Sequence, residues 1–149
     1  MKTKLKVFSP ENKIDSNEKN ELVEFLFKHL DEFGDAEEHI KKSADYAMNK
    51  NKTYGGKILL LYDNKLLIGA VILNKTGMAG YIPENILVYI AIHKDYRGKG
   101  LGKYLMKEAI KRSSGNIALH VEEDNPAKFL YEKLGFKNKY LEMRLNKGK

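Results

Sequence analysis

One stretch in the second half of the chain limits the possible folds more than any other. Residues Ile86–Ile92 are almost continuously apolar and rich in β-branched side chains, as in a strand that is covered on both faces. Three glycines follow at alternate positions, Gly98, Gly100 and Gly102, and apolar side chains then recur at helical spacing. The stretch is therefore predicted to form a buried strand, a tight turn and an amphipathic helix that ends near residues 113–115.

A strand, a glycine-containing turn and a helix in this order create a site for an anion. Glycine lets the backbone approach a ligand closely and adopts positive φ without penalty. The first N–H groups of the helix have no internal acceptor and lie at the positive end of the helix dipole. Lys99, Lys103, Lys107 and Lys111 follow at four-residue intervals and form one row along the helix. The row is either a solvated face or a part of the anion site, and the sequence leaves both interpretations open.

Two common phosphate-binding motifs fail on this stretch. A nucleotide P-loop, G-x-x-x-x-G-K-[ST], aligned on Gly102 puts Arg97 where the first glycine belongs. It also puts Tyr104 where the magnesium-binding hydroxyl belongs. A dinucleotide fingerprint that starts at Gly98 requires a third glycine at a position occupied by Lys103. Neither kind of nucleotide site is therefore expected.

The first part of the chain has two helical patterns. Asp15 and Glu18 have the spacing of a capping box, and apolar residues recur after it at helical spacing up to Gly34. The residues at this spacing are Leu22, Leu26, Leu30 and Phe33, with Val23 and Phe27 beside them. A second helix is predicted over Ala36–Met48, with inward residues Ile40, Ala44, Ala47 and Met48.

The other segments have strand patterns, apart from one more helix. Short strands are predicted at Lys4–Phe8, Lys57–Tyr62, Leu66–Leu73, Ile117–Val121 and Lys137–Leu145. A last helix is predicted between Asn125, a good N-cap residue, and Gly135, which closes it. We find no internal repeat and no linker, so residues 1–149 are predicted to form a single α+β domain.

The composition is that of a globular protein: 42% of the residues are apolar and 32% are charged. There is no cysteine, and the four histidines lack H-x-x-x-H spacing, so neither a disulfide nor a metal site is expected. The N-terminal residues lack an apolar run of signal-peptide length, and no later run approaches about 18 apolar residues. We therefore expect a cytoplasmic protein with no membrane partner.

The net charge of +7 is unevenly distributed. Residues 11–50 carry eleven acidic side chains against six lysines, a balance of −5, whereas residues 51–149 carry eighteen lysines and arginines against nine acidic side chains, a balance of +9. A basic C-terminal part suits a polyanion, either nucleic acid or a phosphorylated cofactor. A nucleic-acid-binding module would need aromatic residues interleaved with the basic row, or a reading helix. Neither is present, so no nucleic-acid partner is expected.

The motif that fits the glycine-rich turn is [QR]-x-x-G-x-[GA], which reads here as Arg97-Gly98-Lys99-Gly100-Leu101-Gly102. In this context it resembles the acetyl-coenzyme A signature of the GNAT superfamily of N-acetyltransferases. A second segment at a matching distance, Asn125–Phe136 with the sequence NPAKFLYEKLGF, resembles the tyrosine-containing helix of the same family. The resemblance covers roughly residues 58–145 and is loose over residues 1–48. One departure is Lys94, where many members carry proline.

The resemblance implies a GNAT-like fold of the α+β class. Its mixed, mostly antiparallel sheet would splay between the fourth and fifth strands and carry helices on both faces. Residues 86–136 would form the acetyl-CoA-binding core, and residues 11–50 the variable helices on the acceptor side. The implied cofactor-binding residues are Ile90, Ala91 and Ile92 for the pantetheine arm, Arg97, Gly98, Lys99, Gly100, Leu101, Gly102 and Lys103 for the pyrophosphate, and Asn125 for the pantetheine arm.

The resemblance also implies transfer of an acetyl group from acetyl-CoA to a primary amine. Tyr131 resembles the tyrosine that protonates the leaving thiolate, whereas its helix alone would favour a role in the core. The base that deprotonates the amine stays open between two residues. His120 is predicted in the strand Ile117–Val121 on the same face as Ala118, and Glu84 lies in the loop ahead of the central strand. The structural alternatives are a histidine satisfied at the sheet surface and a solvated carboxylate.

The acceptor amine, from a small molecule or from a peptide or protein, is expected to be cationic. The reason is that residues 11–50, with their balance of −5, are implied to lie over the acceptor cleft. A catalytically idle acyl-CoA sensor on the same fold is the alternative function, and the presence of Tyr131 argues against it. The predicted last strand, Lys137–Leu145, is in a position to pair across a homodimer.

Overall fold

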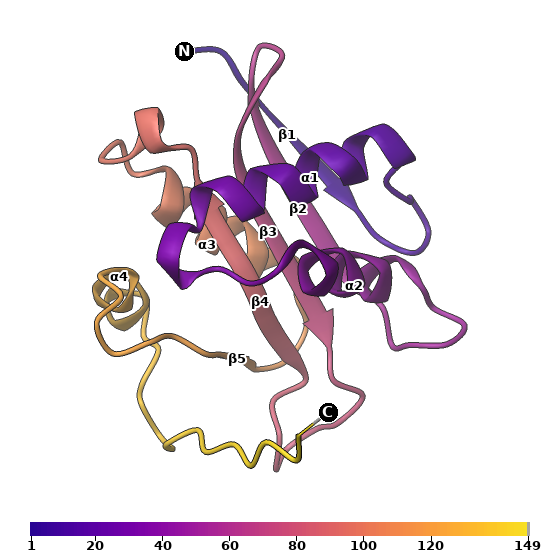
Figure 1. Cartoon of the computed structure of the whole chain (residues 1–149), viewed down its shortest axis with the longest axis vertical. Coiled ribbons are helices and arrows are strands. Elements are labelled where there is room, and N and C mark those ends of the chain that lie inside the picture. The colour runs from indigo at the N-terminus through magenta and orange to yellow at the C-terminus, as the bar shows by residue number, and fades with distance from the viewer. Residues whose placement is uncertain (149) are drawn as a thin grey trace. The chain divides into compact units, whose positions relative to one another are not determined.

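The computed structural model describes residues 1–148, which form two compact units, Met1–Leu119 and the segment that starts at His120. The first unit contains an open sheet with helices packed on it (Figure 1). The second unit contains one short helix. Within residues 1–148, no helix has the length and the apolar character needed to cross a bilayer.

The first unit contains a five-stranded sheet in which neighbours in space are also neighbours in sequence. Its strands are β1 (Thr3–Phe8), β2 (Gly56–Asp63), β3 (Leu66–Lys75), β4 (Asn85–Ile92) and β5 (Ile117–Leu119). Pairing is antiparallel from β1 through β4 and parallel between β4 and β5. The predicted α+β class with a mixed, mostly antiparallel sheet is confirmed.

Helices cover both faces of this sheet, as predicted. In Figure 1, α1 (Ser16–His29) and α2 (Glu37–Met48) lie in front of the strands, and α3 (Leu101–Arg112) lies behind them. A Cβ placed on Gly69 would lie 2.7 Å from Leu105 Cδ1, so the Leu105 side chain of α3 packs directly over the Gly69 backbone of β3. On the other face, α1 and α2 share a core with alternate strand residues, among them Ile58, Leu60, Ala70, Ile72 and Ala91.

The predicted starts of both N-terminal helices are confirmed. Asp15 accepts the Glu18 N–H at 2.7 Å, and the Glu18 carboxylate accepts the Asp15 N–H at 3.2 Å, which is the predicted capping box. α2 begins directly after Ala36. It buries the four residues predicted to face inward, Ile40, Ala44, Ala47 and Met48.

The predicted end of α1 is wrong. The helix ends at His29, because Asp31 adopts a φ of 54° and begins a short 3-10 helix, η1 (Asp31–Phe33). The buried stripe of α1 also differs from the apolar pattern of the sequence: Phe25 lies in it, and Phe27, which the pattern includes, is 52% exposed. Both phenylalanines fit a helical period, so tertiary contacts and not the pattern decide between them.

Two predicted strands also differ from the structure. β5 ends at Leu119, so His120 and Val121 lie outside it. Lys137–Leu145 forms no strand in the described part of the chain, and its apolar residues, Tyr140, Leu141, Met143 and Leu145, are exposed. Alternating apolar residues are compatible with a strand, but the N–H and C=O groups of a strand also need a paired neighbour. A single sequence does not specify that neighbour.

The helix of the second unit lies where it was predicted. It is α4 (Ala127–Lys133), and the Asn125 side-chain oxygen accepts the Ala127 N–H at 2.9 Å at its start. Gly135 adopts a φ of 101° just after the last turn. Tyr131 is the buried residue of α4, with its ring centroid 6.1 Å from that of Phe136.

A column of four aromatic rings joins α1 to the short 3-10 helix η2 (Lys94–Tyr96) that follows β4. The ring centroids of Phe25 and His29 are 4.6 Å apart, those of His29 and His93 are 4.3 Å apart, and those of His93 and Tyr96 are 5.5 Å apart. His29 is only 5% exposed, and its Nδ1 accepts the Lys94 N–H at 3.2 Å. The column therefore fixes the end of β4 against α1.

We expect the free energy of unfolding to fall as the pH is lowered from about 6.5 to 4.5, because of His29. Burial, and after it the neighbouring His93, lowers the pKa of His29 from 6.5 to about 4. In this window the unfolded chain binds a proton on His29 that the native protein does not bind. The loss should reach at most about 1.4 kcal/mol per pH unit. Urea unfolding at several pH values measures this slope.

The matched variants are His29→Asn, which removes the titrating group, and His39→Asn, which removes a histidine with an exposed side chain on α2. We expect the slope to shrink in His29→Asn and to persist in His39→Asn. An equal slope in His29→Asn and the unchanged protein would mean that His29 is not the group that titrates.

Candidate functional site

The loop after β4 presents open backbone, as its glycines predicted. Gly98 and Gly100 adopt φ values of 78° and 80°, in the left-handed region that favours glycine. Among residues 1–148, no heavy atom would lie within 4 Å of a Cβ placed on either glycine. The space above both glycines is therefore free for a ligand.

The first turn of α3 supplies hydrogen-bond donors beside these glycines. Gly100 is the N-cap of α3, and the Tyr104 N–H donates to the Gly100 carbonyl oxygen at 3.1 Å. The N–H groups of the three residues between them, Leu101, Gly102 and Lys103, therefore have no acceptor within the helix. They lie at the positive end of its dipole, which favours an anion.

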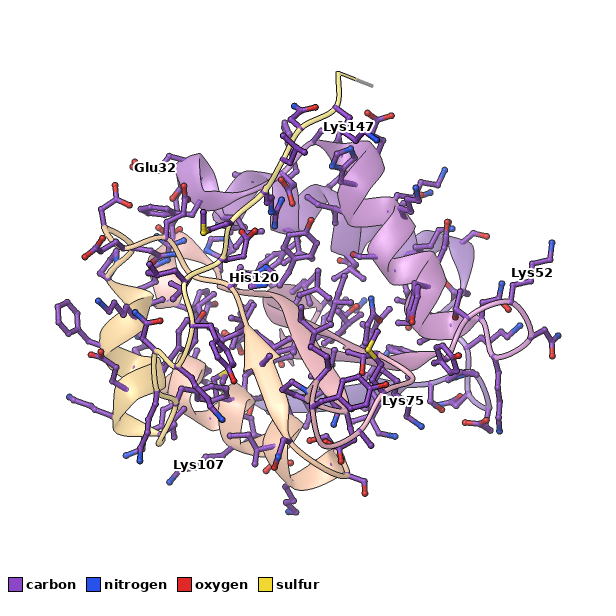
Figure 2. All side chains as sticks on the ribbon, turned by 90° about the horizontal axis from the view of Figure 1, so that it is seen from below. Glu32, Lys52, Lys75, Lys107, His120 and Lys147 are labelled. Atoms are coloured by element: carbon purple, nitrogen blue, oxygen red, sulfur yellow. The ribbon has the colours of Figure 1, made fainter. Side chains whose placement is uncertain are left out.

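The predicted lysine row lies on the exposed side of α3. Lys99, Lys103 and Lys107 are exposed, and Lys107 extends away from the ribbon (Figure 2). Among residues 1–148, none of these three lies within 4.0 Å of a carboxylate oxygen, whereas Lys111 lies 4.0 Å from Glu108. The ammonium groups of these three lysines therefore add positive charge to the side of α3 that begins with the free amides of its first turn.

β4 has an open edge next to this loop. β5 pairs only with the first three residues of β4, Asn85 to Leu87, and β4 continues to Ile92 without it. The registers of β3 and β4 shift between Ile72 and Leu73, which leaves Val88 without a β3 partner at the point where β5 stops pairing. Such bulges increase the local twist of a strand. The pairing of the fourth and fifth strands, where the splay was predicted, is thus limited to the first three residues of β4.

The hydrogen-bond register identifies the groups on the open edge. The His93 N–H donates to the Ile68 carbonyl oxygen at 2.8 Å, and hydrogen bonding to β3 alternates along β4 from there. Ile90 and Ile92 consequently direct their N–H and C=O groups away from β3, whereas Ala91 directs its own toward β3. The Ile92 carbonyl accepts Arg97 Nε at 3.1 Å. Both groups of Ile90 and the N–H of Ile92 face the open edge.

The Arg97 side chain is held by the protein itself. Its Nη2 donates to the His29 carbonyl oxygen at 2.6 Å, and its Nε to the Ile92 carbonyl oxygen. Its Nη1 lies 3.6 Å from Asp31 Oδ2. Of the residues predicted to bind a cofactor, Arg97 is the one whose side chain already has three protein partners.

The sequence did not point to a polar pair on the face of β4 that packs against α1 and α2. The Tyr89 hydroxyl donates to Asp35 Oδ2 at 2.5 Å, which joins the segment between α1 and α2 to the strand beside Ile90. Burial, followed by this hydrogen bond to a carboxylate, raises the pKa of Tyr89 above its usual value. Tyr89 stands out as a phenol within an apolar run, but nothing in the sequence links it to Asp35, 54 residues earlier.

The two candidate bases have different surroundings. Glu84 Oε1 accepts the Asn116 N–H at 3.1 Å, so this carboxylate helps to hold the start of β5. It lies at the end of β4 that pairs with β5, opposite to the glycine-rich loop. His120 is exposed and follows β5, so its predicted position on one strand face with Ala118 is wrong.

Tyr131 and Asn125 belong to the second unit. Burial raises the pKa of Tyr131 to about 12, so its phenol is protonated near neutral pH. The Asn125 side-chain oxygen accepts the Ala127 N–H at the start of α4.

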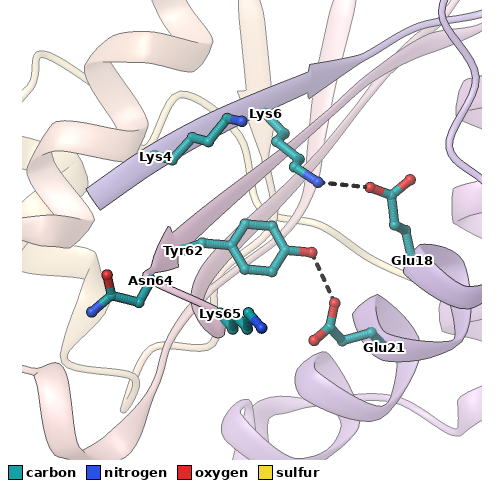
Figure 3. Close-up of a pocket in the computed structure, with 7 residues that line it drawn as sticks. All are labelled: Lys4, Lys6, Glu18, Glu21, Tyr62, Asn64 and Lys65. Carbon is teal, nitrogen blue, oxygen red and sulfur yellow. Dashed lines mark hydrogen bonds and ion pairs between the residues drawn. The ribbon is translucent and has the colours of Figure 1, made fainter. Parts of the chain in front are cut away.

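A separate pocket of about 380 Å³ lies beside β1 (Figure 3). Lys6 Nζ lies 3.1 Å from Glu18 Oε2 in it, and the Tyr62 hydroxyl donates to Glu21 at 2.8 Å. The pocket is lined by Lys4, Lys6, Glu18, Glu21, Tyr62, Asn64 and Lys65. Because β2 and β3 separate β1 from β4, it is not part of the open edge.

Comparison with known proteins agrees with this arrangement. The model of the acetyltransferase (GNAT) domain family matches residues 54–138, more than half of the chain. The chain is 37% identical over 82 residues to the ribosomal protein bS18-alanine N-acetyltransferase of Haemophilus influenzae, covering 52% of this chain and 53% of that protein. It is 35% identical over 79 residues to N-alpha-acetyltransferase 30 of Schizosaccharomyces pombe, covering 50% of this chain and 53% of that protein. The chain thus spans about half the length of these curated relatives.

Solved structures share the fold. A GNAT family acetyltransferase from Streptococcus pneumoniae matches with a TM-score of 0.70 and 18% identity, covering 99% of both chains. The open sheet, the glycine-rich loop and the family match over residues 54–138 lead to one conclusion: the chain belongs to the GNAT acetyltransferase family.

Proposed function

We propose that this chain is an N-acetyltransferase that transfers an acetyl group from acetyl-CoA to a primary amine. The observation that carries the proposal is the open edge of β4, which runs directly into a loop with two left-handed glycines and the first turn of α3. An extended, amide-containing arm and a pyrophosphate are the two kinds of group that such a surface suits.

The residues present fit acetyl-CoA as a substrate. The pyrophosphate would accept the N–H groups of Leu101, Gly102 and Lys103, over the free space at Gly98 and Gly100. The pantetheine arm would pair with Ile90 and the N–H of Ile92, in place of the missing part of β5. The exposed row Lys99, Lys103 and Lys107 adds positive charge for the phosphates.

In the proposed reaction the amine nitrogen attacks the thioester carbonyl carbon, an N–C bond forms and the C–S bond breaks. The carbonyl oxygen gains negative charge in the transition state, and a backbone N–H of the β4 edge would stabilise it. Tyr131, protonated near neutral pH, would donate its proton to the leaving thiolate. The incoming ammonium loses one proton to a base before the attack, for which His120 and Glu84 are the proposed candidates. The nitrogen loses a second proton as the amide forms, and this proton returns to the Tyr131 phenolate.

We propose that the acceptor is a cationic amine of a peptide or protein. The two curated relatives are named for acetylation of a protein alanine and of an N-alpha amine. The segment between α1 and α2 carries Asp31, Glu32 and Asp35, and Asp35 is exposed beside the β4 edge through its bond to Tyr89. A negative segment at this place attracts a positive acceptor.

We expect acetyl-CoA to stabilise the protein. At about 100 times Kd the gain is roughly 2.7 kcal/mol, which a rise in Tm detects. Gly100→Asn should abolish this rise, because a side chain would occupy the free space while asparagine tolerates positive φ. The matched control is Gly80→Asn, since Gly80 also has a φ of 80° and free space but lies in the β3–β4 loop. No rise in the unchanged protein at millimolar acetyl-CoA would refute the proposed function.

We expect Tyr131→Phe to lower kcat by about 10²–10⁴ with little change in Tm, because it removes the proton donor and keeps the ring. The control is Tyr140→Phe, which alters an exposed tyrosine of the same unit. Release of free thiol from acetyl-CoA measures the rate. An unchanged kcat in Tyr131→Phe would exclude its hydroxyl as the acid.

The pH profile of the same assay assigns the base. If His120 takes the proton, the acidic limb of kcat/KM disappears in His120→Ala. If the limb survives there and disappears in Glu84→Gln, the carboxylate is the base. If neither change matters, the amine enters neutral and proximity supplies most of the rate.

We expect Asp35→Asn to raise the KM for a cationic acceptor about 3- to 10-fold while kcat stays within twofold, since it removes a charge and keeps an acceptor for the Tyr89 hydroxyl. The probes are an alanine-initiated peptide with two lysines and the same peptide with glutamates instead. Asp45→Asn removes an exposed α2 carboxylate as the control. Equal KM values for both peptides, unaffected by salt, would contradict a cationic acceptor.

A further inference from the structure

Four polar residues connect the end of α1 to the start of the glycine-rich loop. They are His29 and Asp31 on the α1 side and Lys94 and Arg97 on the loop side, and we call them the latch. The inference about the latch rests on the proposed function only because the glycine-rich loop is taken as the phosphate-binding loop. Its contacts are a feature of the chain itself.

Arg97 is the centre of the latch. The His29 carbonyl is one of the last carbonyls of α1, which have no partner within the helix. Arg97 Nη2 donates to it at 2.6 Å, and the positive guanidinium also suits the negative end of the α1 dipole. The Nε of the same side chain binds the Ile92 carbonyl, so one rigid fork joins α1 to the end of β4.

Asp31 completes the ion pairs. Its carboxylate lies 3.3 Å from Lys94 Nζ through Oδ1 and 3.6 Å from Arg97 Nη1 through Oδ2. The positive φ of Asp31 ends α1 and turns this carboxylate toward the loop. His29 adds a fourth contact through its Nδ1, which accepts the Lys94 N–H.

The position of the latch determines its effect. Arg97 directly precedes Gly98, and glycine is the residue that loses the most conformational freedom on ordering. One end of the loop is fixed by α3, and the latch fixes the other end. Ordering one backbone residue corresponds to about a tenfold change in affinity or more, so an unlatched loop would bind a phosphate ligand less tightly.

We propose that Arg97 is a positioning residue, which orders the phosphate-binding loop by tying it to α1 and does not contact the phosphate through its side chain. This role and a direct ion pair between Arg97 and the ligand can be distinguished by removing the charge of Asp31. By electrostatics alone, removing the negative charge of Asp31 beside an anion site would strengthen the binding of an anion. The same change breaks part of the latch and should therefore weaken anion binding.

The experiment titrates coenzyme A into the full chain by calorimetry. We expect Kd to rise about tenfold in Arg97→Gln and at least threefold in Asp31→Asn. Asparagine is a suitable replacement because it tolerates the φ of Asp31. Arg112→Gln is the control for a lost arginine, since Arg112 pairs only with Glu108 of its own helix among the described residues.

Arg97→Lys separates the two roles. Lysine keeps the charge but cannot form the three-partner fork, so we expect a Kd close to that of Arg97→Gln. A near-normal Kd in Arg97→Lys, or tighter binding in Asp31→Asn, would overturn the proposal in favour of direct contact. Unchanged Kd values in both Arg97 variants would also overturn it.

Amide hydrogen exchange in the ligand-free protein distinguishes a failure of the latch from a failure of the proposed function. We expect faster exchange over residues 97–103 in Arg97→Gln and Asp31→Asn, whether or not coenzyme A binds. If the unchanged protein does not bind coenzyme A, the proposed function fails and exchange alone decides on the latch. If exchange is unchanged in both variants, the latch does not order the loop.

Discussion

The early end of β5 is the constraint on which the candidate site depends. An interior strand pairs on both sides, but β4 has β5 beside it only as far as Leu87. The backbone groups of Ile90 then face outward, and a strand edge with unpaired groups readily accepts another extended chain. Val88 lacks a β3 partner at the same point, so the twist of β4 changes where the pairing is lost. The sheet is thus complete at one end of β4 and open at the other.

The loop at the open end of β4 is fixed from two directions. The aromatic column and Arg97 attach it to α1, and the Tyr96 hydroxyl donates to Asp63 of the β2–β3 hairpin at 2.7 Å. These attached residues directly precede Gly98 and Gly100, whose backbone takes left-handed φ values. The charges lie on different elements: carboxylates are on the segment after α1, and exposed lysines are along α3. Under the proposed function, the phosphate-rich donor would meet the positive surface and the cationic acceptor the negative one.

Local patterns in the sequence predicted the parts of the fold that depend on neighbours in the chain. The capping box at Asp15, the four buried residues of α2 and the left-handed glycines follow from spacing and from backbone sterics. The features that were missed depend on distant residues. Phe27 and Phe25 fit a helix equally well, and only packing buries Phe25. The bond between Tyr89 and Asp35, and the three partners of Arg97, join segments that no periodicity relates. The length of β5 depends on its partner strand, so His120 was wrongly placed in it.

The left-handed Asp31 has a consequence for protein engineering. Loop grafting between relatives is a common way to exchange substrate preference, and the short segment between α1 and α2 is the natural piece to exchange. Here its first residues also hold the loop after β4, through the Asp31 carboxylate and the backbone that precedes it. A graft with glycine at this position keeps the turn and loses both ion pairs, and a β-branched residue strains the turn as well. A graft that starts after Asp31 changes the acceptor side and leaves the attachment in place.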